Sequence, residues 1–169
     1  MHYLNELEDA ISDILTKHTE YESNNIIVSY NNLGFPLVNK DTDALYFYIN
    51  PEENDISNFI NRHYYEDGKT IAQNTEVFTI HFSAYGLNSV DRMRKLLLDW
   101  YSFPVKEKLS KVELYTMPDQ NRGPLRLMEN YNGQWWQRCE LVVGVYCTNS
   151  NEHEVGYYDK YNVIIKESR

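Results

Sequence analysis

One short segment has the residue types of a phosphate-binding loop. Gly68, Lys69 and Thr70 match the end of the motif in which backbone amides and a lysine hold phosphate groups. The full motif also needs a glycine five residues before Gly68, where this chain has His63. A helix should follow the motif, yet residues 70–80 have the pattern of a strand. We therefore expect no nucleotide site.

The histidines and cysteines form no recognisable metal or catalytic pattern. No two of the histidines have the spacing of metal ligands. They are His2, His18, His63, His81 and His153. Cys139 and Cys147 fall on one face of an expected strand, about 26 Å apart, so they cannot form a disulfide with each other. We expect both to be buried, unreactive thiols.

The other polar residues give no enzyme signature. The sequence has no G-x-S-x-G motif, in which a strained turn exposes a nucleophilic serine. Its 25 aspartates and glutamates make carboxylate pairs common, so such pairs identify no acid–base site. We expect no catalytic residue, cofactor or metal. A metal site built from distant residues, and a small enzyme or ligand-binding domain, stay open as alternatives.

Basic residues gather in the second half of the chain. Those on and after the expected second helix are Arg92, Arg94, Lys95, Lys106, Lys108 and Lys111. Arg122 and Arg126 lie in residues 118–133, where recurring Pro, Gly and Asn predict an irregular loop. Two interpretations remain open: a solvated helix face, or a patch that complements an acidic neighbouring subunit. The first helix of this chain is itself acidic.

Helices and strands predicted from hydrophobic spacing must position these residues. The elements expected before residue 70 are a helix at 4–18, strands at 26–30 and 44–49, a short helix within 52–67 and a tight turn at Asp67-Gly68. Carboxylates occupy the first turns of the first helix, where the helix dipole favours them. His18, on the apolar stripe, is expected to be partly buried.

The clearest strand signals come later. Phe78, Ile80 and Phe82 alternate with polar and β-branched residues, which predicts one apolar face. Asn88 and Asp91 resemble a capping box, so a helix should begin there, and Pro104 should end it. The later elements are a turn at 106–110, a strand at 112–115, the strongest strand from 135 or 136 to 147, a polar loop at 148–154 and a last strand at 161–165.

Length and composition bound the fold class. A chain of 169 residues and 20.1 kDa has the length of one domain, which we expect to span residues 1–169. The order of elements predicts an α+β fold: a mixed or mainly antiparallel sheet packed against two main helices. Residues 141–147, the longest apolar run, are too few to cross a membrane, and no secretory signal is recognised. A net charge of −9 argues against a broad nucleic-acid-binding face.

The elements around Trp136 and Arg138 are similar to those of a known family. An amphipathic first helix, a strand ending in HFSAYG, the helix SVDRMRKLLLDWY and a loop precede a strand that opens with Trp136-Gln137-Arg138. This order resembles the tail terminator, tail completion or neck proteins of long-tailed bacteriophages, particularly those with a LIC-type neck terminator domain. The likeness covers residues 76–147 and, more loosely, the first helix. We expect Trp136 to pack against the sheet and Arg138 to pair with a nearby acid.

The resemblance implies a structural virion protein and not an enzyme. Such proteins form a ring, commonly a hexamer, that caps the head-proximal end of the tail tube, stops tube growth and meets the connector of the capsid. The implied partners are further copies of the chain, the tail tube protein, the tail sheath and a neck or connector protein. DNA would pass through the ring without sequence-specific binding. The implied location is the virion, after assembly in the host cytoplasm.

A ring needs contacts that run from one copy to the next, and two further faces for the tube and the neck. We expect residues 118–133 to make such contacts on assembly. Aromatic and arginine side chains often anchor interfaces. The candidates are Arg122, Arg126, Tyr131 and Trp135. A head-closure or stopper protein, or part of a phage-derived injection device, is an alternative role. The sequence leaves open the ring order, the tail type, the face that meets the tube, and the host.

Overall fold

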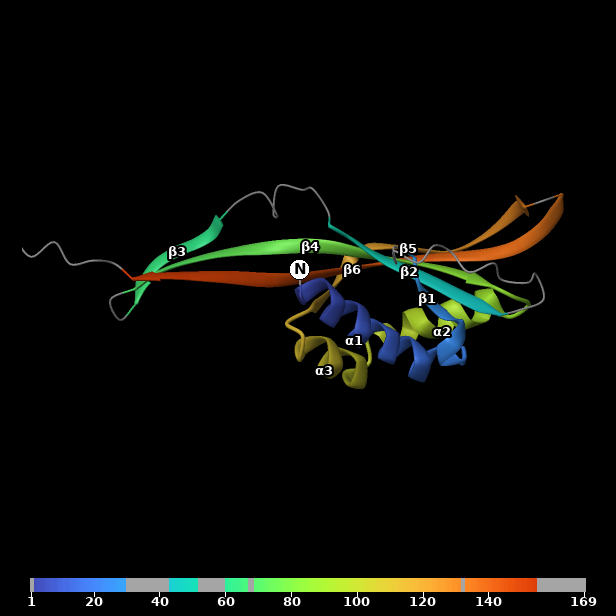
Figure 1. Cartoon of the computed structure of the whole chain (residues 1–169), viewed down its shortest axis with the longest axis horizontal. Helices are drawn as coiled ribbons and strands as arrows, with labels where there is room; N and C mark the ends of the chain where they lie inside the picture. Colours follow the sequence, from blue (N-terminus) through green and yellow to red (C-terminus); the bar gives the residue numbers. More distant parts are fainter. Residues whose placement is uncertain (1, 30–42, 52–59, 67–68, 132, 155–169) are drawn as a thin grey trace, which may run out of the picture.

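The protein is built on a mixed sheet that carries helices on one side (Figure 1). The computed structural model describes residues 2–29, 43–51, 60–66, 69–131 and 133–154. Its elements are α1 (His2–His18), the 3-10 turn η1 (Ser23–Asn25), β1 (Ile26–Val28), β2 (Ala44–Pro51), β3 (Ile60–Glu66), β4 (Lys69–Tyr85), α2 (Ser89–Trp100), α3 (Phe103–Ser110), β5 (Tyr115–Tyr131) and β6 (Gln134–Glu154). The strand order is β1-β2-β4-β6-β5, and β3 also pairs with β4. The sheet is mixed, because β1 and β2 are parallel and the other pairs are antiparallel. With helices packed on this sheet, the predicted α+β fold is confirmed.

The longest feature of the sheet is the antiparallel pair β4–β6. It runs from Lys69 opposite Glu154 to Tyr85 opposite Arg138. We call the sheet face that carries the helices the helix side, and the other face the open side. Alternation sends one set of side chains to the helix side, all buried: Phe78, Ile80, Phe82 and Ala84 from β4, and Cys139, Leu141, Val143, Val145 and Cys147 from β6. The predicted apolar face and the two buried thiols are confirmed.

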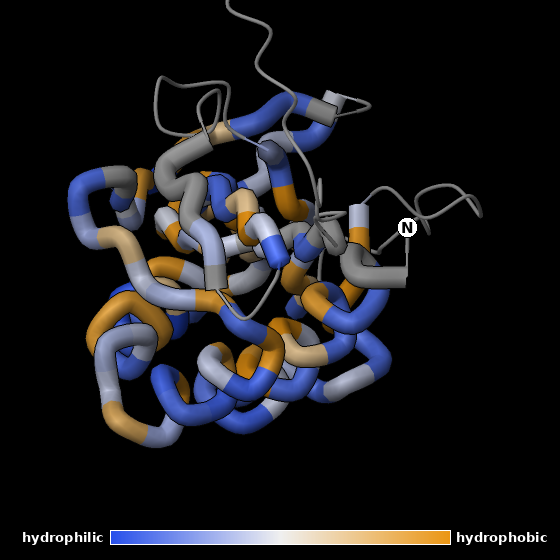
Figure 2. Tube along the Cα trace, turned by 90° about the vertical axis from the view of Figure 1, so that its left-hand side faces the viewer, coloured by the Kyte–Doolittle hydropathy of each residue, from blue (hydrophilic) through white to orange (hydrophobic). Residues whose placement is uncertain are grey.

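The three helices cover this face with their own apolar stripes. Hydrophobic and hydrophilic residues alternate along them (Figure 2). Their fully buried residues include Leu7, Ile11, Ile14 and Leu15 in α1, Met93, Leu96 and Trp100 in α2, and Val105 and Leu109 in α3. At the centre, the Phe82 ring lies 6.5 Å from Phe47 and 5.8 Å from Trp100, measured between ring centroids. Phe82 therefore joins two strands to α2.

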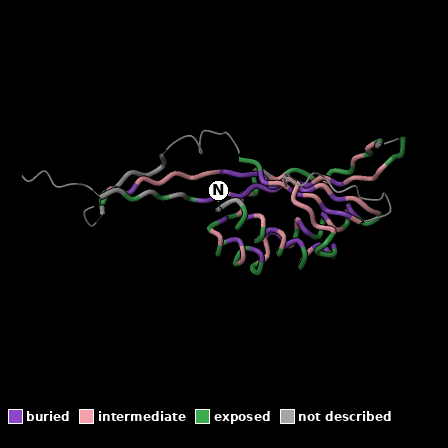
Figure 3. Tube along the Cα trace, in the orientation of Figure 1, coloured by how far each residue is buried: buried purple, intermediate pink, exposed green. Residues whose placement is uncertain are grey.

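The sheet continues past the helices at both ends of the molecule (Figure 1). At one end is an extension that we call the arm: β3, residues 69–75 of β4 and residues 148–154 of β6. At the other end is the hairpin formed by residues 125–131 of β5 and 134–140 of β6. Buried residues concentrate where the sheet overlies the helices, and the described side chains toward both ends are mostly intermediate or exposed (Figure 3).

Two loop predictions were wrong. Residues 118–133 are not an irregular loop, because β5 runs through most of them and pairs with β6. Register shifts between Met117 and Arg122, and between Arg122 and Leu125, accommodate the proline and glycine residues in this strand. Residues 148–154 are also strand, because they continue β6 and pair with the start of β4.

Four smaller predictions also need correction. Residues 60–66 form β3, so the short helix expected within 52–67 does not extend into them, while residues 52–59, the turn at 67–68 and the expected last strand at 161–165 lie outside the described residues. Pro104 does not end a helix but lies in the first turn of α3, where proline is tolerated. α2 begins at Ser89, directly after Asn88 as predicted, but Asn88 makes no side-chain capping bond. The strand expected at 112–115 begins only at Tyr115.

Shortening Phe82 tests this account of the core. Phe82→Ala should lower the free energy of unfolding by about 3–5 kcal/mol, because it removes a ring packed against Phe47 and Trp100. The matched control is Leu98→Ala on the exposed face of α2, which should change stability by less than about 0.5 kcal/mol. Urea denaturation measures both variants. Equal losses in the two would contradict the assignment of Phe82 to the centre of the core.

Candidate assembly interface

The W-x-R motif lies on the open side of β6, where its two side chains are neighbours. The Trp136 ring meets the Tyr85 ring edge to face, with centroids 6.1 Å apart and planes at 87°. Tyr85 in turn contacts Tyr46 in the same way at 5.7 Å. An aromatic row therefore crosses β2, β4 and β6. The expectation that Trp136 packs against the sheet is confirmed.

Arg138 holds two carboxylates at the base of the hairpin. Its guanidinium nitrogens lie 3.1 Å from a Glu129 oxygen and 2.8 Å from a Glu140 oxygen. The Tyr85 hydroxyl donates to Glu129 at 3.0 Å. Burial raises the pKa of the Tyr85 phenol, so it stays protonated and remains a donor. The expected pairing of Arg138 with an acid is confirmed, and the cluster fastens β5 to β6 and β4.

The register of β5 and β6 places each candidate interface residue. Arg126 stands opposite Cys139, and Trp135 opposite Asn130, which puts both on the helix side of the hairpin. Arg122 stands opposite Val142 and therefore belongs to the open side. Tyr131 ends β5 opposite Gln134. The structure thus brings Arg126 and Trp135 to one face and separates Arg122 from them.

A third residue that sequence reasoning missed completes that face. Met128 stands opposite Gln137, diagonal to Trp135, and the two side chains are 58% and 65% exposed. Arg126 is exposed and donates to the Gln137 side-chain oxygen at 3.2 Å. We call Arg126, Met128 and Trp135 the hairpin patch. The alternation of residues 125–131 could have revealed it if that segment had been recognised as a strand.

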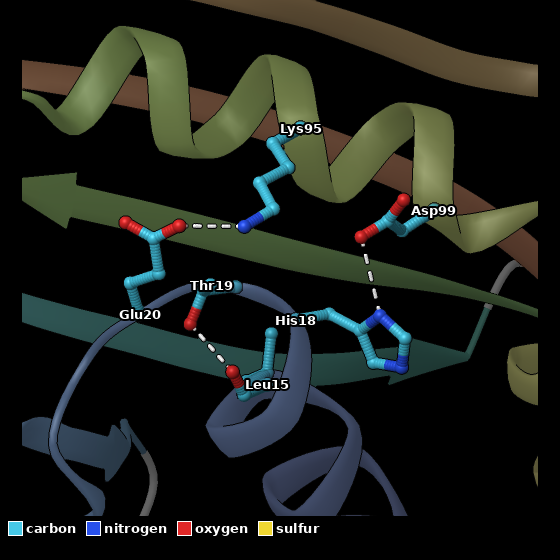
Figure 4. A network of polar contacts seen from close by, with 6 residues as sticks. All are labelled: Leu15, His18, Thr19, Glu20, Lys95 and Asp99. Carbon is cyan, nitrogen blue, oxygen red and sulfur yellow. Dashed lines mark hydrogen bonds and ion pairs between the residues drawn. The ribbon is translucent and has the colours of Figure 1, made fainter.

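Most of the basic residues on α2 and α3 are already paired within the chain. The Lys95 ammonium lies 2.6 Å from a Glu20 carboxylate oxygen, which joins α2 to the end of α1 (Figure 4). His18 is partly buried, as predicted, and its Nδ1 lies 3.2 Å from an Asp99 oxygen (Figure 4). The other pairs are Arg92–Asp43, Arg94–Asp91, Lys108–Asp13 and Lys111–Glu107. These pairs favour the interpretation of a helix face over that of a docking patch.

The arginines whose side chains the structure describes divide into two groups by partner. Arg92, Arg94 and Arg138 each have a carboxylate within ion-pair distance. Arg122 and Arg126, both exposed, have no carboxylate partner among the described residues. Since an unpaired arginine is free to anchor a contact, these two remain the better candidates for an interface.

The described residues give little basis for a chemical site. Lys69 and Thr70 open β4, as the strand pattern of residues 70–80 predicted, whereas the phosphate-loop motif requires a helix at this place. Within the described ranges, no group of three or more His, Cys, Asp or Glu side chains could hold a metal ion. No helix in the part of the chain that the structure describes is long and apolar enough to cross a membrane.

The comparison with protein families agrees with the resemblance seen in the W-x-R region. A family profile described as phage neck terminator protein matches residues 5–168. The chain belongs to this family. Membership supports a structural role in the phage tail or neck. A search of curated proteins finds no match.

The cluster around Arg138 predicts a measurable stability difference. Arg138→Gln should lower the free energy of unfolding by about 1–3 kcal/mol, because Glu129 and Glu140 would lose their shared cation in a partly buried place. The matched control is Arg94→Gln, which breaks only an exposed pair with Asp91 and should cost less than about 0.5 kcal/mol. Urea denaturation distinguishes them. A control as damaging as Arg138→Gln would contradict a structural role for the cluster.

Proposed function

We propose that copies of this chain close into a ring, a hexamer, at the head-proximal end of the phage tail tube. The ring ends polymerisation of the tube and joins the tail to the neck or connector. Its partners are further copies of the chain, the tube protein, the tail sheath in a contractile tail, and a neck protein. It works as a structural part of the virion and catalyses no reaction.

The observation that carries this proposal is the match to phage neck terminator proteins over residues 5–168. The shape of the chain supports it, because the sheet projects past the helices at opposite ends, as the arm and the hairpin (Figure 1). A subunit with different projections at its two ends is suited to head-to-tail contacts, and such contacts form rings when the rotation closes.

The charge of the chain supports passage of DNA through the ring. Each copy carries a net charge of −9, so a ring multiplies a charge of the same sign as DNA. Like charge disfavours retention of the passing duplex. The ring therefore encircles DNA without sequence-specific binding.

The proposed ring predicts the mass of the purified chain. Light scattering over a range of concentrations should show a species near six times the chain mass of 20.1 kDa. Electron micrographs of that species should average to a ring with a central hole. A large species without a hole, or one of open-ended length, would contradict a closed ring.

Loss of the gene tests the place of the protein in assembly. In a phage that encodes this chain, disruption of its gene should leave filled heads unjoined to tails, and tail tubes of irregular length. Wild-type protein supplied from a plasmid should restore joined particles, which electron microscopy and titre both report. Unjoined tails of normal, uniform length would instead indicate a head-closure or stopper protein. Normal virions would contradict both roles.

A further inference from the structure

The hairpin patch has the residue types of a protein interface, and in a single copy these residues are exposed. Trp135 and Met128 expose more than half of their surface beside each other at the end of the molecule. Arg126, on the same face, has an amide as its partner and no described carboxylate. Exposed aromatic, methionine and arginine side chains together are typical of contact anchors. A partner with apolar surface and negative charge would therefore complement this face.

Three carboxylates near the start of α1 have no oppositely charged partner among the described residues. Glu6, Glu8 and Asp9 lie within one turn, and none has an ion pair with a described residue. Partial burial and the neighbouring Asp9 carboxylate raise the pKa of Glu8. By contrast, Asp13, one turn later in α1, binds Lys108.

These two surfaces cannot meet within one copy. The hairpin extends beyond one end of the helix layer, while α1 begins toward the other end, where the arm continues outward (Figure 1). Complementary surfaces that lie apart on one chain can form a contact between copies that repeats in one direction.

We propose that the hairpin patch of one copy docks on the start of α1 in the next copy, with Arg126 against the carboxylates of Glu6 and Asp9 and with Trp135 and Met128 packed beside them. This inference rests on the proposed ring and names the surfaces that close it. A second copy fits better than nucleic acid, because the patch has one arginine on a chain of net charge −9. Both halves of the contact, moreover, are present on the same chain.

Charge reversal tests the contact in the phage whose gene is disrupted. Two variants are supplied from plasmids: Arg126→Glu on the hairpin, and Glu6→Lys combined with Asp9→Lys on α1. Each alone should lower the titre to that of the empty plasmid, since each places like charges across every boundary between copies. Trp135→Ser should do the same by removing the apolar anchor. The matched control, Arg94→Glu on the exposed face of α2, should complement like wild type.

Supplying the two charge variants together gives the sharpest result. In a ring that alternates them, the glutamate introduced on one hairpin faces the lysines introduced on α1 at one boundary. At the next boundary, the native Arg126 faces the native carboxylates. Every boundary then pairs opposite charges, so the mixture should restore a titre well above that of either variant alone. If two copies instead joined through their hairpin patches, α1 would lie outside the contact, and the α1 variant would have no defect for the mixture to rescue.

The outcomes separate this inference from the proposed function. Circular dichroism confirms that each purified variant is folded. If folded Arg126→Glu and Trp135→Ser both complement like wild type, the hairpin contact is overturned while termination stands. If each charge variant alone fails to complement and the mixture does not restore the titre, the pairing of the hairpin patch with α1 is also overturned. If disruption of the gene leaves virions normal, the proposed function itself fails.

Discussion

The backbone pairing of β4 with β6 is the constraint on which the rest of the structure depends. The two strands stay in register over all 17 residues of β4, although the helices cover only part of that length. Every other strand but β1 attaches to one of them: β2 and β3 follow each other along β4, and β5 borders β6. Backbone hydrogen bonds between the two strands continue past the helices and hold the arm together, and β6 continues with β5 into the hairpin at the other end. A modest core thereby carries two projections at opposite ends.

The sequence predicted the parts of the fold that bury an apolar face. The stripe of α1, the alternation of Phe78, Ile80 and Phe82, and the apolar run in β6 were recognisable because burial imposes a period. β3, the end of β6 and most of β5 were not, because their sequences alternate only weakly between polar and apolar residues. Residues 148–154 pair with residues 69–75, which are distant in the sequence, so locally they look like a loop. Pro104 was misread because proline suits both the end of one helix and the beginning of the next.

The candidate site was predicted in residue type but not in arrangement. Arginine and tryptophan in residues 118–135 were proposed as contact residues, and the W-x-R motif was expected to pack and pair as it does. The division of Arg122 from Arg126 depends on strand register, which no local pattern encodes. Likewise, the pairs of Lys95 with Glu20 and of Lys108 with Asp13 are seen only when α1 and the residues after it are placed beside α2 and α3. Which charges remain unpaired is a property of the tertiary structure, and that property identifies the hairpin patch.

An image reconstruction of the head–tail junction, in a phage that encodes this chain, tests the central claim most directly. The account predicts a closed ring of copies at the head-proximal end of the tail tube. Each hairpin should lie against the α1 helix of the next copy, at the boundary between them. A junction without this chain, or a ring in which the hairpins point into solvent and touch no neighbouring copy, would contradict it.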